Sequence, residues 1–190
     1  MPTSIRRWRK YNFFQKKQNR NGARRTGTPR FHNREKGCII VEIREILPWD
    51  RDNYLKLAHD FYRSSACDHP IPDENLARTF DLLIEGDTPY ARCIAAADAR
   101  GQLVAYLLMA VTWSQEAGGL TVWLEELMIR EDLRGQGLGT QMIEAAMACY
   151  PNAARFRLEV SESNTRAAAL YTRLGFTPLP YGQMILEPKA

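Results

Sequence analysis

The sequence predicts an α/β (α+β) protein with a mixed, mostly antiparallel central sheet and helices on both faces. In the middle of the chain, strand patterns follow one another across short turns, which is typical of an antiparallel meander. Towards the C-terminus, helix and strand patterns alternate, as they do where strands run parallel. The chain has 190 residues, 45% of them hydrophobic and 25% charged, which suits one globular domain of ordinary size.

The first half of this fold is a strand followed by two helices. Residues 39–46 are apolar and then alternate with charged residues, which indicates a strand. Pro48 opens a helix, and a second helix follows from about Asp73, after a loop over 64–72 whose prolines exclude helix. The apolar faces of the two helices consist of Tyr54, Leu57, Ala58 and Phe61, and of Leu76, Phe80, Leu83 and Ile84.

The second half contains the meander and then the alternation of helices and strands. Turns over 98–101 and 115–119 contain glycine and separate the strands of the meander, and Gly175 follows the last helix as a C′ residue. The predicted elements are strands over 90–97, 102–112 and 120–129, a helix over 138–149, a strand over 156–160, a helix over 164–174 and a last strand centred on 184–186.

Charge divides the chain into two parts. Residues 1–36 carry 12 Lys/Arg and one acidic residue, a net charge of +11, whereas residues 37–190 carry 14 Lys/Arg and 21 Asp/Glu, a net charge of −7. The first part is too poor in aliphatic residues to offset its ordering entropy, so we expect a disordered basic tail. Residues 37–190 are the expected domain, and their acidity mildly favours a cationic partner.

Three interpretations of the tail remain open. Aromatic residues interleave with arginines, as in segments that bind nucleic acid by stacking and by phosphate contacts. An Arg-rich, acid-poor N-terminus also occurs in organellar transit peptides. The third interpretation is a segment without function, including a start codon assigned too far upstream.

Several classes of protein are excluded by what the sequence lacks. No apolar run approaches the roughly 20 residues of a spanning helix, and the N-terminus has no secretory signal. The four cysteines form no Cys-x-x-Cys motif and the three histidines are scattered, so we expect no metal site. Reduced thiols of this kind are typical of a cytoplasmic protein, and we expect no membrane contact.

A glycine-rich turn gives the strongest functional signal. Gly135, Gly137 and Gly139 lie between a strand and an amphipathic helix, where free amides and the helix dipole favour an anion such as a diphosphate. Thr140 stands where a dinucleotide fingerprint requires glycine, and a Walker A lysine is absent. The pattern that fits is Arg/Gln-x-x-Gly-x-Gly/Ala, beginning at Arg134, although a plain helix start also satisfies it.

A second motif follows about 25 residues after Gly139. It reads N-x-x-A-x-x-L-Y-x-x-x-G-F and is formed by Asn164, Ala167, Leu170, Tyr171, Gly175 and Phe176. With both motifs in place, residues from about 39 to 187 resemble the GCN5-related N-acetyltransferase (GNAT) superfamily. The resemblance implies a sheet splayed between its fourth and fifth strands, and acetyl-CoA as the donor. It does not extend to residues 1–36.

The resemblance also implies which residues bind acetyl-CoA, as a co-substrate and without a metal. The pantetheine arm would lie against the fourth strand, where the amide of Met128 or Leu127 would face the thioester oxygen. Asn164 would bond the arm, cap its helix, or do both. The implied binding residues are Leu127, Met128 and Ile129 for the arm, Arg134, Gly135, Gln136, Gly137, Leu138, Gly139 and Thr140 for the diphosphate, and Asn164.

Three residues are candidates for the chemistry. In the family the position of Tyr171 is the usual general acid towards the departing thiolate; the alternative is a packed helix aromatic. Glu125 and Glu126 are candidate bases, and neighbours on a regular strand point to opposite faces. Because Leu-Glu-Glu resembles the Leu-Glu-Asp stretch of diamine and polyamine acetyltransferases, we favour Glu125. The alternative is that both are salt-bridged structural acids.

The acceptor cannot be identified from the sequence. In this superfamily the loop between the first two helices and the region between strands three and four set specificity, which points to Asp68, His69, Trp113 and Glu116. The leading hypothesis is acetylation of a small-molecule amine. The alternatives are a protein N-terminal or lysine acetyltransferase with an RNA- or ribosome-docking tail, and a non-catalytic acetyl-CoA-binding module. A homodimer is a common assembly in the superfamily.

Overall fold

The computed structural model describes residues 41–64, 71–85 and 88–188. Several sequence-based expectations lie outside these residues: the basic segment 1–36, the start of the first strand at Ile39 and Ile40, and the candidate pocket residues Asp68 and His69. Among the described helices, none is long and apolar enough to cross a membrane.

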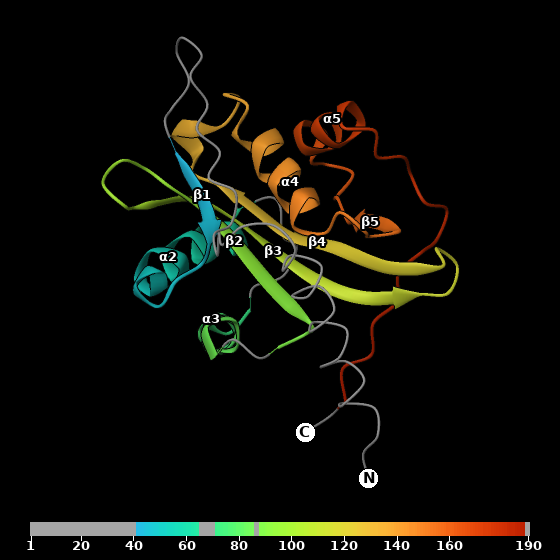
Figure 1. Ribbon diagram of the computed structural model, residues 1–190, viewed down its shortest axis with the longest axis horizontal. Helices are drawn as coiled ribbons and strands as arrows, with labels where there is room; N and C mark the ends of the chain where they lie inside the picture. Colours follow the sequence, from blue (N-terminus) through green and yellow to red (C-terminus); the bar gives the residue numbers. More distant parts are fainter. Residues whose placement is uncertain (1–40, 65–70, 86–87, 189–190) are drawn as a thin grey trace, which may run out of the picture.

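A five-stranded mixed sheet forms the centre of the molecule (Figure 1). Strands pair in chain order, antiparallel from the first to the fourth, and the fourth and fifth pair in parallel. This arrangement confirms the predicted fold class. The strands are β1 (Glu42–Glu45), β2 (Ala91–Ala97), β3 (Leu103–Ser114), β4 (Gly119–Ile129) and β5 (Arg155–Leu158).

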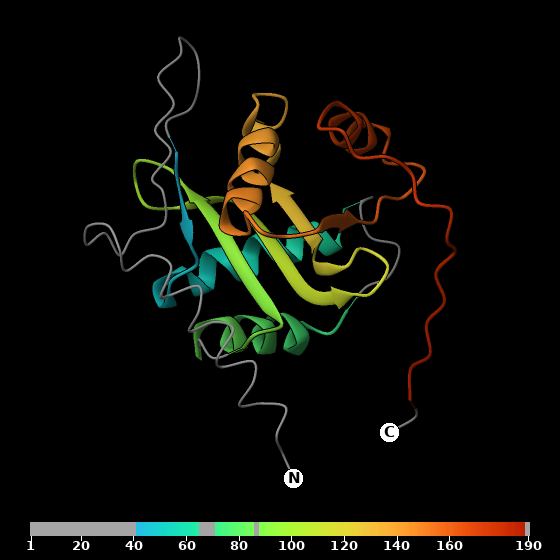
Figure 2. The same ribbon diagram turned by 45° about the vertical axis from the view of Figure 1, so that its right-hand side comes forward.

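Helices cover both faces of the sheet (Figures 1 and 2). Helices α2 (Arg51–Tyr62) and α3 (Asp73–Glu85) pack on one face, against a cluster that includes Tyr106 and Met128. Helix α4 (Leu138–Cys149) packs on the other, against a cluster that includes Val122 and Leu124, with α5 (Thr165–Arg173) beside it. Because β2 and β3 are covered on both faces, their centres are almost continuously apolar, as the sequence Cys-Ile-Ala-Ala-Ala of β2 illustrates.

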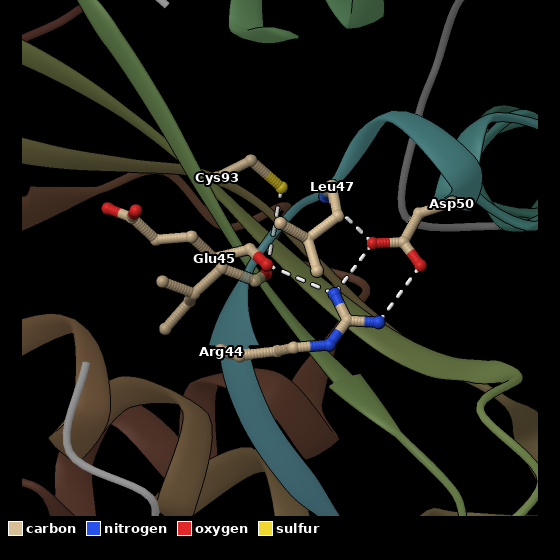
Figure 3. A network of polar contacts seen from close by, with 6 residues as sticks. Arg44, Glu45, Leu47, Asp50 and Cys93 are labelled. Carbon is tan, nitrogen blue, oxygen red and sulfur yellow. Dashed lines mark hydrogen bonds and ion pairs between the residues drawn. The ribbon is translucent and has the colours of Figure 1, made fainter. Parts of the chain in front are cut away.

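A buried ion pair fixes the junction between β1 and α2 (Figure 3). Arg44 donates two hydrogen bonds to the carboxylate of Asp50, at 2.6 and 3.0 Å, and the backbone amide of Leu47 donates a third at 2.8 Å. Asp50 is only 1% exposed, so its charge needs these partners. The short 3₁₀ turn Pro48–Asp50 thereby leads the chain from the sheet edge into α2.

The C-terminal segment differs from the prediction. The last strand predicted around 184–186 is wrong, because the described residues after 175 form no strand. Met184, Ile185 and Leu186 are 98%, 83% and 91% exposed, and Figures 1 and 2 show the segment running down the outside of the molecule. A short apolar run forms a strand only where a sheet edge pairs with it, and none of the described strands pairs with this one.

Candidate functional site

The site begins where β4 and β5 separate. Their parallel register covers Thr121 to Leu124 on β4 and ends at the pair Leu124–Leu158. From there β4 continues to Ile129, and no described strand pairs with it on that side. Figure 2 shows β5 leaving the direction of β4 there, which is the expected splay. The amide of Arg130 donates to the carbonyl of Val104, so the backbone groups of Arg130 face β3. Along a strand, successive residues direct their backbone amides and carbonyls to alternate sides. The amides and carbonyls of Leu127 and Ile129 therefore face the open edge.

A β-bulge lies at the start of this open edge. Leu108 of β3 pairs with Glu126 while its neighbour Met109 pairs with Leu124, so Glu125 is an extra residue in β4. Leu124 and Leu127 both pack on the α4 side, which strict alternation would not allow for residues three apart. The bulge interrupts the regular alternation on which the expectation of opposite faces for Glu125 and Glu126 depends, so alternation alone no longer assigns a face to Glu125.

Glu126 is held on the α2 side of the sheet by two phenols. The hydroxyl of Tyr62, at the end of α2, donates to Oε1 at 2.7 Å, and the hydroxyl of Tyr106, on β3, donates to Oε2 at 2.7 Å. Tyr106 is completely buried, and Tyr54 lies against its ring with the centroids 5.0 Å apart. Burial and the neighbouring Glu126 raise the pKa of Tyr106 well above its ordinary value, so the phenol stays a donor. Sequence reasoning missed both tyrosines.

Glu125 has a different environment. Its side chain is exposed and lies beside two other carboxylates, Glu126 in β4 and Glu159 just after β5. Partial desolvation, followed by the charges of Glu159 and Glu126, raises the pKa of Glu125 above its ordinary value. No ion pair with a described Lys, Arg or His neutralises Glu125 or Glu126, which speaks against the salt-bridged alternative.

The three glycines of the turn after β4 meet different requirements. Gly135 and Gly137 have φ of +83° and +85°, a conformation that a side chain disfavours. Gly139 lies inside α4, where an added Cβ would come within 2.9 Å of Leu170 and 3.3 Å of Ile129. Gly137 is the N-cap of α4 and offers no side chain to its first amides. The turn therefore presents free amides at a helix N-terminus that packs closely on β4 and α5.

Polar side chains hold this turn and the start of α5 in shape. Arg134 donates from Nε to the carbonyl of Ile129 at 2.9 Å, on the open edge of β4. Gln136 donates to the carbonyl of Asp132 at 2.9 Å. Asn164 is the N-cap of α5, and its Oδ1 accepts from the amide of Ala167 at 3.2 Å, which confirms the predicted cap. The described residues hold no cluster of three or more potential metal ligands.

Tyr171 lies in α5 on the face of the sheet opposite to Glu126. It packs against the same cluster as Leu127, and its ring meets Phe176 edge-on at 5.9 Å. Gly175, with φ of +90°, ends the helix as predicted, and the amide of Phe176 bonds back to the carbonyl of Tyr171. Burial raises the pKa of Tyr171, so its phenol is protonated at neutral pH.

The remaining predicted pocket residues lie at the far end of the β3–β4 hairpin. Trp113 is 60% exposed near the end of β3. Glu116, in the turn that follows, forms an ion pair with Arg155 at 2.9 Å, and this arginine lowers its pKa. Because Arg155 neutralises the charge of Glu116, we assign Glu116 no role in the site around Glu125.

Comparison with known proteins agrees with this geometry. Residues 51–176 match the model of the Acetyltransferase (GNAT) family. A mouse protein named thialysine N-epsilon-acetyltransferase is 28% identical over 147 residues, which cover 71% of this chain and 83% of that protein.

Solved structures share the fold at lower sequence identity. A possible acetyltransferase from Clostridium difficile 630 superposes with a TM-score of 0.67 at 18% identity, covering 79% of this chain and 99% of its own. An aminoglycoside N-acetyltransferase in complex with CoA has a TM-score of 0.63 at 14% identity, with 82% and 99% of the two chains covered.

Proposed function

The chain belongs to the acetyltransferase (GNAT) family, and from that premise we propose that it transfers the acetyl group of acetyl-CoA to the primary amine of a small molecule. The observation that carries the proposal is the open edge of β4 beyond Leu124, which leads into a turn with free helix amides. An extended ligand with a diphosphate at one end matches both features.

The residues present fit such a donor. The backbone of Leu127 and Ile129 offers hydrogen-bonding groups to a pantetheine arm, with Met128 between them paired to β3. The amides from Gly135 to Thr140 suit a diphosphate, since three glycines keep that backbone accessible. The amide of Arg134 already donates to the carbonyl of Glu131 at 3.1 Å, so the predicted range begins one residue later. Asn164 has its Oδ1 engaged by the cap and its NH₂ group available as a donor.

Acetyl-CoA supplies an acetyl group activated as a thioester. The ammonium form first loses one proton and becomes a neutral amine. Its nitrogen then bonds to the acetyl carbon while the carbon–sulfur bond breaks, and the nitrogen releases its second proton to solvent. We assign Glu125 as the base that takes the amine proton, because a raised pKa makes it a better base near neutral pH. The amide of Leu127 is the donor to the carbonyl oxygen, since it faces the open edge.

Two further residues complete the assignment. Tyr171, a phenol whose pKa burial raises further above neutrality, donates a proton to the leaving sulfur and regains one from solvent. Glu126, held by two phenols, anchors the ammonium form of the acceptor and is not the base. The proposed anchor Glu126 and the proposed acid Tyr171 thus lie on opposite faces of the sheet.

The proposal is tested by measuring CoA release from acetyl-CoA with the full chain and a panel of acceptors. The panel holds monoamines, polyamines, aminoglycosides, amino acids, and peptides with a free N-terminus or lysine. Glu125→Gln is compared with Glu144→Gln, a matched change on the exposed face of α4. We expect turnover with small amines that Glu125→Gln abolishes and Glu144→Gln retains. Exclusive turnover of peptides would favour a protein acetyltransferase, and CoA binding without any turnover a non-catalytic module.

A further inference from the structure

The segment on the outside of the molecule carries a run of apolar side chains in solvent. Met184, Ile185 and Leu186 are 98%, 83% and 91% exposed, and consecutive exposed apolar residues are typical of a contact surface. No described residue shares a backbone hydrogen bond with residues 182–188, so their amides and carbonyls are available to pair. Extended backbone with apolar side chains is what a strand needs in order to add to the edge of a sheet.

The outer edge of β5 can accept such a strand. β5 is the last strand of the described sheet, so its far side pairs with no described strand. Phe156 and Leu158 are partly buried on the α4 side of the sheet. Side chains alternate along a strand, so Arg155 and Arg157 lie on the other side. The edge therefore offers one apolar face and one basic face to an incoming strand.

One antiparallel register matches residues 183–187 to β5. In this register apolar residues meet on the α4 side of the sheet, and opposite charges meet on the other side. The opposed pairs are Met184 with Leu158, Leu186 with Phe156, and Glu187 with Arg155. A shift by one residue in either direction sets two apolar residues against charged ones, so the alternation selects this register. Arg155 keeps donors for Glu187 beside its ion pair with Glu116, because a guanidinium carries several N–H groups.

Within one chain these two features lie apart. Gln183 donates to the carboxylate of Glu159, just after β5, and beyond it the segment runs down the outside of the molecule instead of along β5 (Figure 2). Pro178 and Pro180 each fix a φ angle in the connection from α5, which favours an extended course. Each chain thus presents one strand-like segment and one sheet edge, and two copies can satisfy both at once.

We propose that residues 183–187 of one copy add to β5 of a second copy as an antiparallel strand, in the register given above. The second copy returns the same contact, so the assembly is a twofold symmetric dimer. The exchanged strand covers the exposed run Met184–Leu186 and extends the sheet beside the splay between β4 and β5. This inference does not rest on the proposed function, because strand pairing needs neither donor nor acceptor.

Sedimentation velocity of the full chain over a range of concentrations is the first test. Leu186→Asp places a carboxylate against Phe156 and should weaken the dimer at least about tenfold. Leu179→Asp is the same change in the same segment, outside the paired residues, and should leave the dimer intact. A parent protein that is monomeric at every concentration would overturn the inference. So would a dimer that both variants retain, or that both lose equally.

A pair of cysteines tests the register. Met184→Cys/Leu158→Cys is oxidised mildly and compared on a non-reducing gel with the parent protein and with the shifted pair Ile185→Cys/Leu158→Cys. Opposed residues of antiparallel strands lie close enough for a disulfide, whereas neighbours on a strand point to opposite faces. We expect a linked dimer from the opposed pair alone. A disulfide within one chain would show that the segment closes on its own β5 and would overturn the exchange, as would the absence of any link.

Discussion

Replacing Glu125 by glutamine should abolish most of the activity and stabilise the fold. The change keeps the size of the side chain and removes its ability to accept the amine proton. General-base catalysis contributes about 10²–10⁴-fold, so we expect kcat/KM to fall at least about a hundredfold. Steady-state release of CoA, followed with an amine that the parent protein acetylates, measures this loss.

The gain in stability follows from the raised pKa of Glu125. A carboxyl whose pKa is higher in the folded state than in the unfolded state favours folding while it is protonated, and this contribution is lost as pH rises through the folded pKa. At neutral pH the ionised carboxylate therefore costs stability that glutamine does not. Because the side chain is exposed and screened by solvent, the gain is at most about 1 kcal/mol, or about 2–4 °C in Tm. It should appear at about pH 7.5 and vanish at about pH 4, below the unfolded pKa.

The neighbouring charges determine where activity falls at low pH. The base works only when ionised, so kcat/KM decreases as pH drops through the pKa of Glu125. Of the two acidic neighbours, Glu159 contributes more to the raised pKa than Glu126. Glu159→Gln should therefore move the acid limb of the kcat/KM profile to lower pH by a fraction of a unit, and Glu126→Gln by less.

Two results would refute this reasoning. One is parental activity in the Glu125→Gln variant, which would place the base elsewhere. The other is a Glu125→Gln variant that is less stable than the parent protein at neutral pH, which would mean that the carboxylate has a stabilising partner. If the acid limb of the kcat/KM profile did not move in Glu159→Gln, the group that titrates there would not be Glu125.

Three further predictions concern the other residues of the site. Tyr171→Phe should lower kcat about tenfold or more at unchanged KM for acetyl-CoA, and equal turnover would exclude it as the acid. Tyr62→Phe removes one of the two phenols that donate to the carboxylate of Glu126 and should raise the KM for the acceptor about fivefold. The same change at the exposed Tyr90 should leave this KM unchanged. Gly137→Ala forces a side chain into φ of +85° at a cost of about 1–2 kcal/mol and should weaken CoA binding. Gly118→Ala imposes similar strain at φ of +69° in a remote hairpin and should leave CoA binding unchanged, as calorimetry can show.

Local signals were enough to predict much of the fold and part of the site. The helix over 138–149, the Asn164 cap and the C′ position of Gly175 depend on residues within a few positions of one another, and the structure contains all three. Features of this kind can be predicted from sequence, because few residue types suit a helix N-cap or a left-handed position at a helix end.

The environment of Glu125 and Glu126 could not be predicted in the same way. The bulge at Glu125 depends on how many residues of β3 and β4 face one another, which is a property of the pairing and not of either strand. The phenols that hold Glu126 come from positions 64 and 20 residues away in the chain. The strand predicted around 184–186 failed for a related reason, because an apolar run cannot show whether a sheet edge will accept it.

The glycine-rich turn shows how one sequence pattern can combine separate requirements. Gly135 and Gly137 have a backbone conformation that suits a ligand-facing turn, whereas Gly139 lets α4 pack against β4 and α5 at once. A Cβ atom at Gly139 would lie 2.9 Å from the side-chain end of Leu170 and 3.3 Å from that of Ile129. Gly139 therefore lies between the strand proposed to hold the donor and the helix that carries Tyr171, and a side chain there would require Leu170 and Ile129 to shift. The third glycine of the motif thus leaves room for these two side chains, while the first two shape the anion-binding turn.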